Sequence, residues 1–296
     1  ARMTNKLFFI INSWFLTSVS NYIFLVDTIS LFHYFLIKRL YSSYEMLSIK
    51  PLESSYHPLP PLGSEPQKPI TDLKNHIRTI LNDILSEIEC KEIETGGESI
   101  TVPHSKRVAK IATATAETLS LNVSHQLVEL CALAHDIGKL FMDNDIIHSD
   151  EKVSPEIRKK KINPHPQQGI SILVSYLEKS SLRENLVLKS LRNAVLYHHQ
   201  KLDGSGYPKM LNGDEMFLST QIIAIADAFD AILTRAYRER MSFDEAIDKL
   251  REELLAKPKQ YNSEIVEEVY QTVIENRSIY EAFTEEEEEL FGAVAV

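Results

Sequence analysis

Cysteine and positive charge are both scarce in this sequence. Its two cysteines among 296 residues, Cys90 and Cys131, lack the spacing of a metal-binding motif and exclude a disulfide framework. A reducing compartment is therefore expected. Asp and Glu outnumber Lys and Arg by 42 to 32, so the net charge is −10. Because a surface that binds duplex nucleic acid needs a broad basic excess, we expect no duplex partner, although a local basic cluster can still bind a small anion.

The first residues differ from the rest of the chain. Residues 7–26 carry no charged side chain, and about 20 apolar-leaning residues suffice to span a bilayer. Polar side chains interrupt this stretch, and each costs free energy in lipid; they are Asn12, Ser13, Thr17, Ser18, Ser20 and Asn21. A membrane span, a surface helix, a packed piece of a small domain and a signal peptide all stay open. Membrane contact through residues 7–37 is one of these expectations.

Changes in composition predict four regions. Residues 1–50 form the hydrophobic N-terminal segment or a small accessory domain, and residues 51–69 are rich in Pro and Ser, which is typical of a linker. Residues 70–283 form one large domain, and residues 284–296 form an acidic, solvated tail. The functional site is expected in the large domain.

Helical periodicity runs through residues 70–283. Apolar residues recur at spacings of three and four, as at Leu127, Leu130 and Ala134. Ser242 with Glu245 three residues later is a capping box, and Ser263 is a candidate N-cap. No sustained period-two alternation and no internal repeat interrupts this pattern. The sequence predicts an all-α fold, a helical bundle with a small N-terminal appendage.

Histidine and aspartate stand at helix ends or on apolar faces in five separate segments. His135 and Asp136 end one apolar run, and Asp227 lies within another. Burying such groups costs free energy unless a partner compensates them, and a divalent cation accepts both imidazole nitrogen and carboxylate oxygen. Each segment alone has a simpler explanation: a helix cap, a surface pair of histidines, or a carboxylate that accepts hydrogen bonds from the backbone or an arginine.

The order of these groups makes the metal interpretation stronger. Along the chain they read H, HD, H, HH and D, and seven ligands fit two octahedral ions that share Asp136. These candidate ligands are His104, His135, Asp136, His165, His198, His199 and Asp227. The remaining histidines lie outside the pattern and are expected at the surface; they are His33, His57, His76, His125 and His148.

At these residues the chain resembles the HD-GYP family of cyclic di-GMP phosphodiesterases, which belongs to the HD superfamily of metal-dependent phosphohydrolases. HDIGK at 135–139 resembles the first signature of the family, and HHQKLDGSGYP at 198–208 resembles the second. HPQQG lies between them at 165–169, and DAFDAILTRAYRERMSFDEAI follows at 227–247. The resemblance covers roughly residues 72–283 and implies an HD-domain helical bundle.

The resemblance also implies roles for individual residues. The seven residues above would be the metal ligands, and Lys139 would contact the scissile phosphate beside the catalytic Asp136. A signature loop would lie beside the substrate, formed by Asp203, Gly204, Gly206, Tyr207 and Pro208. RAYR resembles the family's RPYR, which implies that Arg235 and Arg238 touch the nucleotide phosphates. The simpler explanations are a helix-terminal cation for Lys139 and an ordinary turn for the loop.

Three positions depart from the family pattern. Ile100 stands where some members carry the Glu that holds a third metal, so we expect two ions, although Glu94 or Glu98 could fold back toward the site. Gln200 replaces the usual Glu after the paired histidines. RAYR lies one residue closer to Asp227 than is usual, which weakens the arginine assignments.

The function implied by the resemblance is hydrolysis of cyclic di-GMP, or of a related cyclic dinucleotide, by a hydroxide that two metal ions activate. Iron fits the ligand set best and manganese next. The alternatives are a catalytically weak cyclic dinucleotide-binding module, another HD-type nucleotide phosphohydrolase, and a di-iron redox sensor. The catalytic domain is expected in the cytoplasm, with membrane association through its N-terminus and a homodimer left open.

Overall fold

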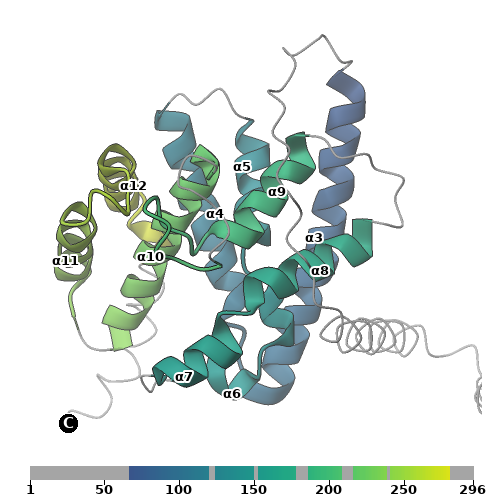
Figure 1. Cartoon of the computed structure of the whole chain (residues 1–296), viewed down its shortest axis with the longest axis horizontal. Coiled ribbons are helices and arrows are strands. Elements are labelled where there is room, and N and C mark those ends of the chain that lie inside the picture. The colour runs from purple at the N-terminus through teal and green to yellow at the C-terminus, as the bar shows by residue number, and fades with distance from the viewer. Residues whose placement is uncertain are drawn as a thin grey trace, which may run out of the picture. The chain divides into compact units, whose positions relative to one another are not determined.

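The computed structural model describes residues 67–119, 124–149, 153–177, 186–208, 216–238 and 241–280, and within these ranges it contains helices and loops but no strand (Figure 1). The predicted all-α fold is therefore confirmed. The N-terminal segment, with its expected membrane contact through residues 7–37, and the acidic tail lie outside the described residues, and the four region boundaries stay predictions. No helix among the described residues has the length and apolar character needed to cross a membrane.

The first described helix begins inside the region predicted as a linker. Helix α3 starts at Gln67, and the elements follow in the order α3 (Gln67–Gly96), α4 (Thr101–Thr118), α5 (His125–Ala134), η1 (Ile137–Phe141), α6 (Asn144–Ile147), α7 (Pro155–Ile157), η2 (Arg158–Ile162), α8 (His165–Leu177), α9 (Leu186–Tyr197), α10 (Leu218–Arg238), α11 (Phe243–Leu255) and α12 (Ser263–Glu275). Helix α4 packs against α5 and α10, and α9 packs against α5, α8 and α10, while α11 and α12 pack against α10 on the side away from α3 (Figure 1).

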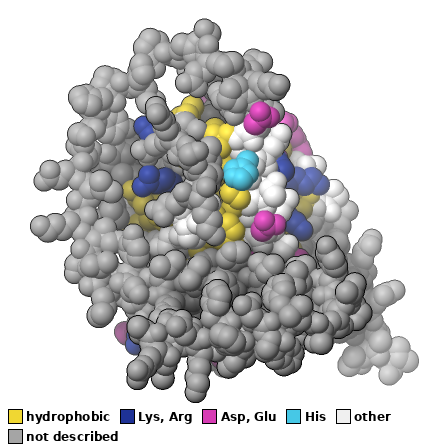
Figure 2. All heavy atoms as spheres, turned by 90° about the vertical axis from the view of Figure 1, so that its right-hand side faces the viewer, with side chains coloured by type: hydrophobic (Ala, Val, Ile, Leu, Met, Phe, Trp, Pro, Cys, Tyr) yellow, Lys and Arg dark blue, Asp and Glu magenta, His cyan; other side chains and the backbone are white. Residues whose placement is uncertain are grey.

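The apolar stripes read from the sequence form one continuous core. Helix α10 shows why: its apolar residues recur at three and four spacing, so one face packs into the bundle. Burial of such side chains contributes about 1.5–3 kcal/mol each. The largest fully buried side chains include Ile84, Ile111, Leu130, Leu191 and Phe229. The face shown in Figure 2 carries acidic and basic side chains beside apolar ones. Its described part therefore has no patch of a single charge.

Helix starts follow the expected chemistry with one correction. The Ser242 and Glu245 capping box at the start of α11 is confirmed, because each side chain accepts from the other residue's backbone N–H. The candidate cap Ser263 is wrong by one residue. Asn262 is the N-cap of α12, and its Oδ1 accepts from the N–H groups of Glu264 and Ile265 at 2.9 and 3.4 Å.

A buried carboxylate from another helix caps α4, the helix that carries His104. Ile100 precedes α4 and has no side chain that can cap it. Glu92 of α3 is fully buried, and it accepts from the backbone N–H groups of Ile100 at 2.8 Å and Thr101 at 3.0 Å, as well as from the Thr101 hydroxyl. A negative charge at a helix N-terminus also meets the positive end of the helix dipole. Glu92 therefore fixes where α4 begins.

Removing the charge of Glu92 should destabilise the protein. Glu92→Gln keeps one acceptor oxygen for the two N–H groups, but it removes the negative charge at the helix N-terminus and replaces the oxygen that accepts from the Thr101 hydroxyl with an NH2 group. We therefore expect the free energy of unfolding to fall by about 2 kcal/mol. Urea denaturation measures this change. Glu94→Gln, at an exposed position two residues along the same helix, should leave stability within about 0.5 kcal/mol. Equal stability of the two variants would show that Glu92 does not cap α4.

Candidate metal centre

All seven candidate ligands converge in the structure, from five segments that are far apart in the sequence. His104 Nε2 lies 3.1 Å from Asp227 Oδ1 and 3.4 Å from Asp136 Oδ2. The other imidazoles surround the same carboxylates. The distances are 3.3 Å from His135 Nε2 to Asp136 Oδ2, 3.3 Å from His165 Nε2 and 3.8 Å from His198 Nε2 to Asp136 Oδ1, and 4.0 Å from His199 Nδ1 to Asp227 Oδ2.

Asp136 lies between two groups of histidines. Its Oδ2 faces the group that contains His104 and His135, and its Oδ1 faces the group that contains His165 and His198. The ligand atoms of His104, His135 and Asp136 lie within 4.8 Å of one another, as do those of His165, His198 and His199. The two carboxylate oxygens thus point to two separate ligand groups, which is the arrangement a bridging ligand needs.

Local backbone geometry explains how adjacent residues reach one site. Helix α5 ends at Ala134, and His135 is its C-cap. Helix α9 ends at Tyr197, so His198 and His199 lie in a turn, and their rings approach to 4.1 Å between centroids. Two neighbours on a continuing helix would point about 100° apart. The end of the helix is what lets both face the centre.

Two glycines let η1 approach the start of α8. A Cβ atom on Gly169 would lie 3.3 Å from Gly138 N and 2.6 Å from Val195 Cγ1 of α9, and one on Gly138 would lie only 1.8 Å from the backbone oxygen of His165. No L side chain fits at such distances without moving the backbone. The glycine of HDIGK therefore allows the close contact that puts Asp136 beside His165.

The hydrogen bonds of the imidazole rings fix their tautomers. The Nδ1 atoms of His135, His165 and His198 lie 2.6, 2.7 and 3.1 Å from the backbone oxygens of Ala132, Ile162 and Ala194. A carbonyl oxygen only accepts, so each Nδ1 carries a proton, and in the neutral tautomer this leaves the Nε2 lone pair turned into the centre. His165 Nε2 and His198 Nε2 lie 3.1 Å apart, which brings two lone pairs together.

These lone pairs have no protein donor between them. His135 Nε2 is buried and makes no hydrogen bond to a described residue. Burial and the neighbouring imidazoles hold the pKa of His198 well below its usual range, and burial with His165 lowers that of His199 to about 3, so both rings are neutral. Converging lone pairs and carboxylates need positive charge, and the donor set of nitrogen and hard oxygen fits a divalent transition metal.

The charges around the carboxylates agree with this interpretation. Burial opposes ionisation of Asp136, but Lys139 and His135 hold its pKa well below the usual range. Burial likewise opposes protonation of His104, yet contacts with Asp136, Asp227 and Asp230 raise its pKa well above the usual value. Without a metal ion, His104 is therefore protonated and Asp136 is ionised.

Lys139 lies at the edge of the centre. It is carried by η1, and its Nζ lies 2.6 Å from Asp136 Oδ2. Burial lowers its pKa, but Asp136 and Asp227 outweigh this and raise it. Lys139 is therefore a fixed positive charge beside the bridging carboxylate, and its contact with a phosphate stays a prediction.

The signature loop folds directly onto the second histidine group. A Cβ on Gly206 would lie 2.2 Å from the backbone oxygen of His199, which also accepts from Tyr207 N at 3.2 Å. The Tyr207 ring lies 4.7 Å from that of His199, at 33° between planes. Gly204 has a φ of 74°, and the Tyr207–Pro208 peptide bond is cis.

Asp203 is the member of the loop that does not face the centre. Its side chain is exposed, and Oδ1 accepts from Ser205 N at 2.9 Å, as in an Asx turn. Gln200, by contrast, is buried, and its Nε2 donates to the backbone oxygen of Pro208 at 2.9 Å. The residue that departs from the family pattern thus holds the end of the loop.

The described part of the chain that carries this site matches a known protein family. A family model described as an HD domain matches residues 97–257, more than half of the chain. The chain belongs to the HD domain family. Together with its HDIGK and GYP signatures and its curated relatives, the match confirms the expected HD-GYP membership.

The relatives are bacterial phosphodiesterases. The 3′3′-cGAMP-specific phosphodiesterase 3 of Vibrio cholerae is 35% identical over 52% of this chain and 32% of its own length, and phosphodiesterase 2 of the same organism is 31% identical over 67% and 35%. The cyclic di-GMP phosphodiesterase response regulator RpfG of Xanthomonas campestris is 29% identical over 60% and 44%. The chain thus spans less than half the length of each of these relatives.

A solved HD domain overlays only loosely on this one. The phosphodiesterase PgpH HD domain of L. monocytogenes, in complex with cyclic di-AMP, is 20% identical, covers 65% of this chain and 94% of its own, and gives a TM-score of 0.44.

Several predicted residues lie outside the centre or outside the described side chains. Arg235 and Arg238 end α10, but their side chains are not among the described ones. Glu94 and Glu98 are exposed, so neither folds back to the centre, and the expectation of two ions rather than three stays a prediction.

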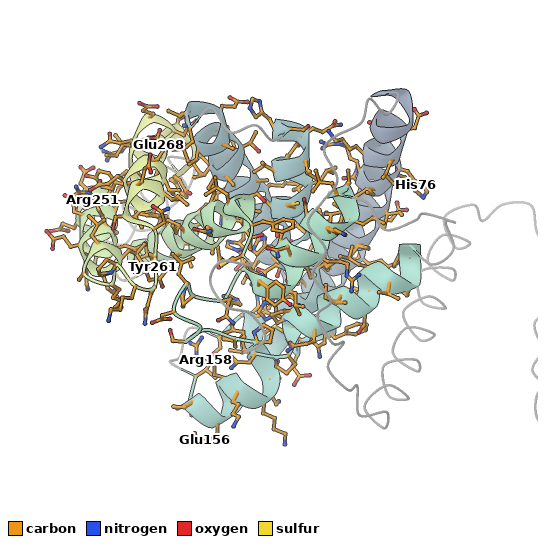
Figure 3. The ribbon with its side chains drawn as sticks, turned by 45° about the horizontal axis from the view of Figure 1, so that its top comes forward. His76, Glu156, Arg158, Arg251, Tyr261 and Glu268 are labelled. Carbon is orange, nitrogen blue, oxygen red and sulfur yellow. The ribbon has the colours of Figure 1, made fainter. Side chains whose placement is uncertain are left out.

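The histidines outside the pattern divide into three cases. His76 on α3 (Figure 3) is exposed, and so is His125 on α5, as expected. The expectation is wrong for His148, which is partly buried against Gly96. His33 and His57 lie outside the described residues.

The HD domain also contains contacts that the sequence did not indicate. Asp230, one turn after Asp227, bonds to His104 and Arg107; the only signal was a second carboxylate in an apolar run. The charge of Arg158, on η2 (Figure 3), lowers the pKa of Tyr207, against the stronger raising effect of burial. Its sequence signal was a short basic run, RKKK at 158–161.

Metal binding should stabilise this HD domain through His135. We expect Mn²⁺ added to metal-free protein at about 100 times its dissociation constant to contribute about 2.7 kcal/mol, or roughly 5–10 °C in melting temperature at this size. His135→Ala should remove most of the rise. His125→Ala, at the exposed other end of α5, should keep it. Thermal melts followed by circular dichroism measure both, and equal rises in the two variants would contradict the assignment.

Proposed function

We propose that this HD domain hydrolyses a phosphodiester bond of a cyclic dinucleotide, with cyclic di-GMP as the first candidate. The observation that carries the proposal is the position of Asp136, whose two oxygens face two separate groups of histidines. Two ions held there, iron first and manganese next, would activate a water and offset charge on the phosphoryl oxygens. The names of the relatives support the substrate class.

The residues of the chain contribute binding and orientation around those ions. Asp136 and Asp227 supply negative charge that would hold cations, and five imidazoles supply nitrogen ligands. Backbone carbonyl oxygens fix the orientation of three of these rings, and Asp230 fixes that of His104. Lys139 places a positive charge 2.6 Å from Asp136 Oδ2. That ammonium lies where negative charge would grow on a phosphate bound to the centre, so it stabilises the transition state electrostatically.

The loop and η2 form the substrate side of the proposed site. The partly exposed ring of Tyr207 lies against His199 and closes one edge of the centre. Arg158, from the basic turn of η2, brings a positive charge near that ring. A cyclic dinucleotide carries two phosphates, and the second one needs a cation away from the metal ions. Arg158, Arg235 and Arg238 are the candidates for that contact.

Which two bases the substrate carries requires a direct comparison of cyclic dinucleotides. Some relatives are named for 3′3′-cGAMP and others for cyclic di-GMP. Purified protein loaded with iron or Mn²⁺ should convert cyclic di-GMP, 3′3′-cGAMP or both to the linear dinucleotide, which chromatography resolves. Tight binding without product would support the weak signalling module, and turnover of nucleoside triphosphates alone would support another HD-type hydrolase.

Asp136→Asn should abolish hydrolysis while the fold stays intact. The amide keeps one acceptor oxygen but loses the charge that two cations share, so we expect kcat/KM to fall by at least about a thousandfold. The assay is product formation from cyclic di-GMP with saturating Mn²⁺. Asp248→Asn, an exposed position that bonds to Tyr270 on the far helices, should keep full activity. Undiminished turnover by Asp136→Asn would sink the two-metal proposal.

Lys139→Gln should lower kcat more than it raises KM. The variant removes the ammonium that faces the developing phosphoryl charge, and loss of one such group costs about 100-fold in kcat. Steady-state kinetics give the two parameters separately. Lys257→Gln removes a comparable surface ion pair with Glu253 and should leave both unchanged. A rise in KM with kcat unaltered would show that Lys139 contributes only to binding.

A further inference from the structure

Behind His104 lies a third carboxylate that does not enter the metal centre. Asp230 of α10 is fully buried, and its Oδ2 lies 2.7 Å from His104 Nδ1. Arg107, one turn after His104 on α4, donates to the same carboxylate through Nε at 2.7 Å and Nη2 at 2.9 Å. The guanidinium fork holds both oxygens of Asp230, so the carboxylate cannot rotate away from the imidazole.

This contact distinguishes His104 from the other imidazoles of the centre. His135, His165 and His198 each donate Nδ1–H to a neutral backbone carbonyl. His104 is the ligand whose Nδ1–H meets a carboxylate within hydrogen-bond distance. A charged acceptor behind an imidazole fixes its tautomer and makes the opposite nitrogen a stronger donor to a metal than a carbonyl does.

The two ligand groups also differ in the charge around them. His104 Nε2 has carboxylate oxygens of both Asp227 and Asp136 within 3.4 Å. In the group of His165, His198 and His199, the nearest carboxylate oxygens lie 3.3, 3.8 and 4.0 Å from the ring nitrogens. Lys139 Nζ lies 2.6 Å from Asp136 Oδ2 and offsets part of the Asp136 charge on the His104 side. The difference between the two positions therefore lies in Asp227, whose oxygens are 3.1 Å from His104 Nε2 but 4.0 Å from His199 Nδ1, and in Asp230 behind His104. Since a cation binds more tightly where negative charge is concentrated, the two positions are unequal.

We propose that Asp230, held by Arg107, is a positioning residue that makes the metal position at His104 the tighter of the two. This inference rests on the proposed two-metal centre. Asp230 orients the ring and raises its donor strength, while Asp136 and Asp227 supply the charge at the ion itself. The first ion to bind occupies the His104 position, and the three-histidine position fills at higher metal concentration.

The experiment is calorimetric titration of metal-free full-length protein with Mn²⁺. The wild-type protein should show two classes of site, one per chain in each. Asp230→Asn keeps an acceptor for His104 but presents an NH2 group to Arg107 and loses the charge. It should weaken the tighter class by about 10- to 100-fold and leave the weaker class nearly unchanged. Arg107→Lys keeps the charge but loses the fork, and a smaller weakening of the same class is expected.

A matched control separates this effect from general loss of an ion pair. Arg78 on α3 and Glu129 on α5 form another two-bond pair, at 3.0 and 2.6 Å, that touches no candidate ligand. Glu129→Gln should leave both classes of Mn²⁺ site intact. In a His104→Ala background, Asp230→Asn should cause no further loss, because the ring through which it acts is gone.

The outcomes are distinct. Two equal sites in the wild type, or a tighter class that survives Asp230→Asn, would overturn the inference while the metal centre stands. Equal weakening by Glu129→Gln would also overturn it, since the effect would then be general. If Asp230→Asn does not fold, Arg107→Lys decides between the same results. Absence of any Mn²⁺ binding by the wild type would overturn the metal centre and this inference together.

Discussion

Electron pairs of the same kind meet at the middle of this bundle, and the rest of the structure depends on how that is resolved. Four imidazoles turn Nε2 toward Asp136 at 3.3–3.8 Å. Backbone carbonyl oxygens accept from Nδ1 of three of these rings, His135, His165 and His198, so the neutral tautomer of each leaves Nε2 without a proton. Such a set repels itself unless positive charge lies within it. The protein supplies part of that charge through Lys139, and the remaining demand is what gives the centre its affinity for cations.

The scaffold is built to hold this unfavourable cluster in place. Glu92 fixes the first turn of α4, Gly138 lets η1 touch α8, and the end of α9 turns two consecutive histidines to the same side. None of these features touches a metal-binding atom directly. Each restricts the movement of a candidate ligand, so the packing of the bundle holds these side chains together against their mutual repulsion.

The centre was readable from the sequence because its ligands are motif residues with fixed neighbours. His135, Asp136 and the paired histidines stand where helices end, and the order of the segments identifies them together. Asp230 was not readable. A buried carboxylate held by an arginine was the simpler explanation weighed for Asp227, and the structure finds that arrangement three residues later. The pairing joins α4 and α10, more than 100 residues apart, and no local pattern encodes such an approach. The same limit applies to Glu92, whose partners lie on the next helix.

The backbone oxygen of His199 has a consequence for how specificity can change in this protein. One atom accepts the Tyr207 N–H, and a Cβ on Gly206 would collide with it, while Gln200 next to it holds Pro208. The signature loop and the candidate ligand His199 therefore move together. A substitution that moves the loop would also shift the His199 ring. Changes in substrate preference and in metal preference are therefore expected to arise together during evolution.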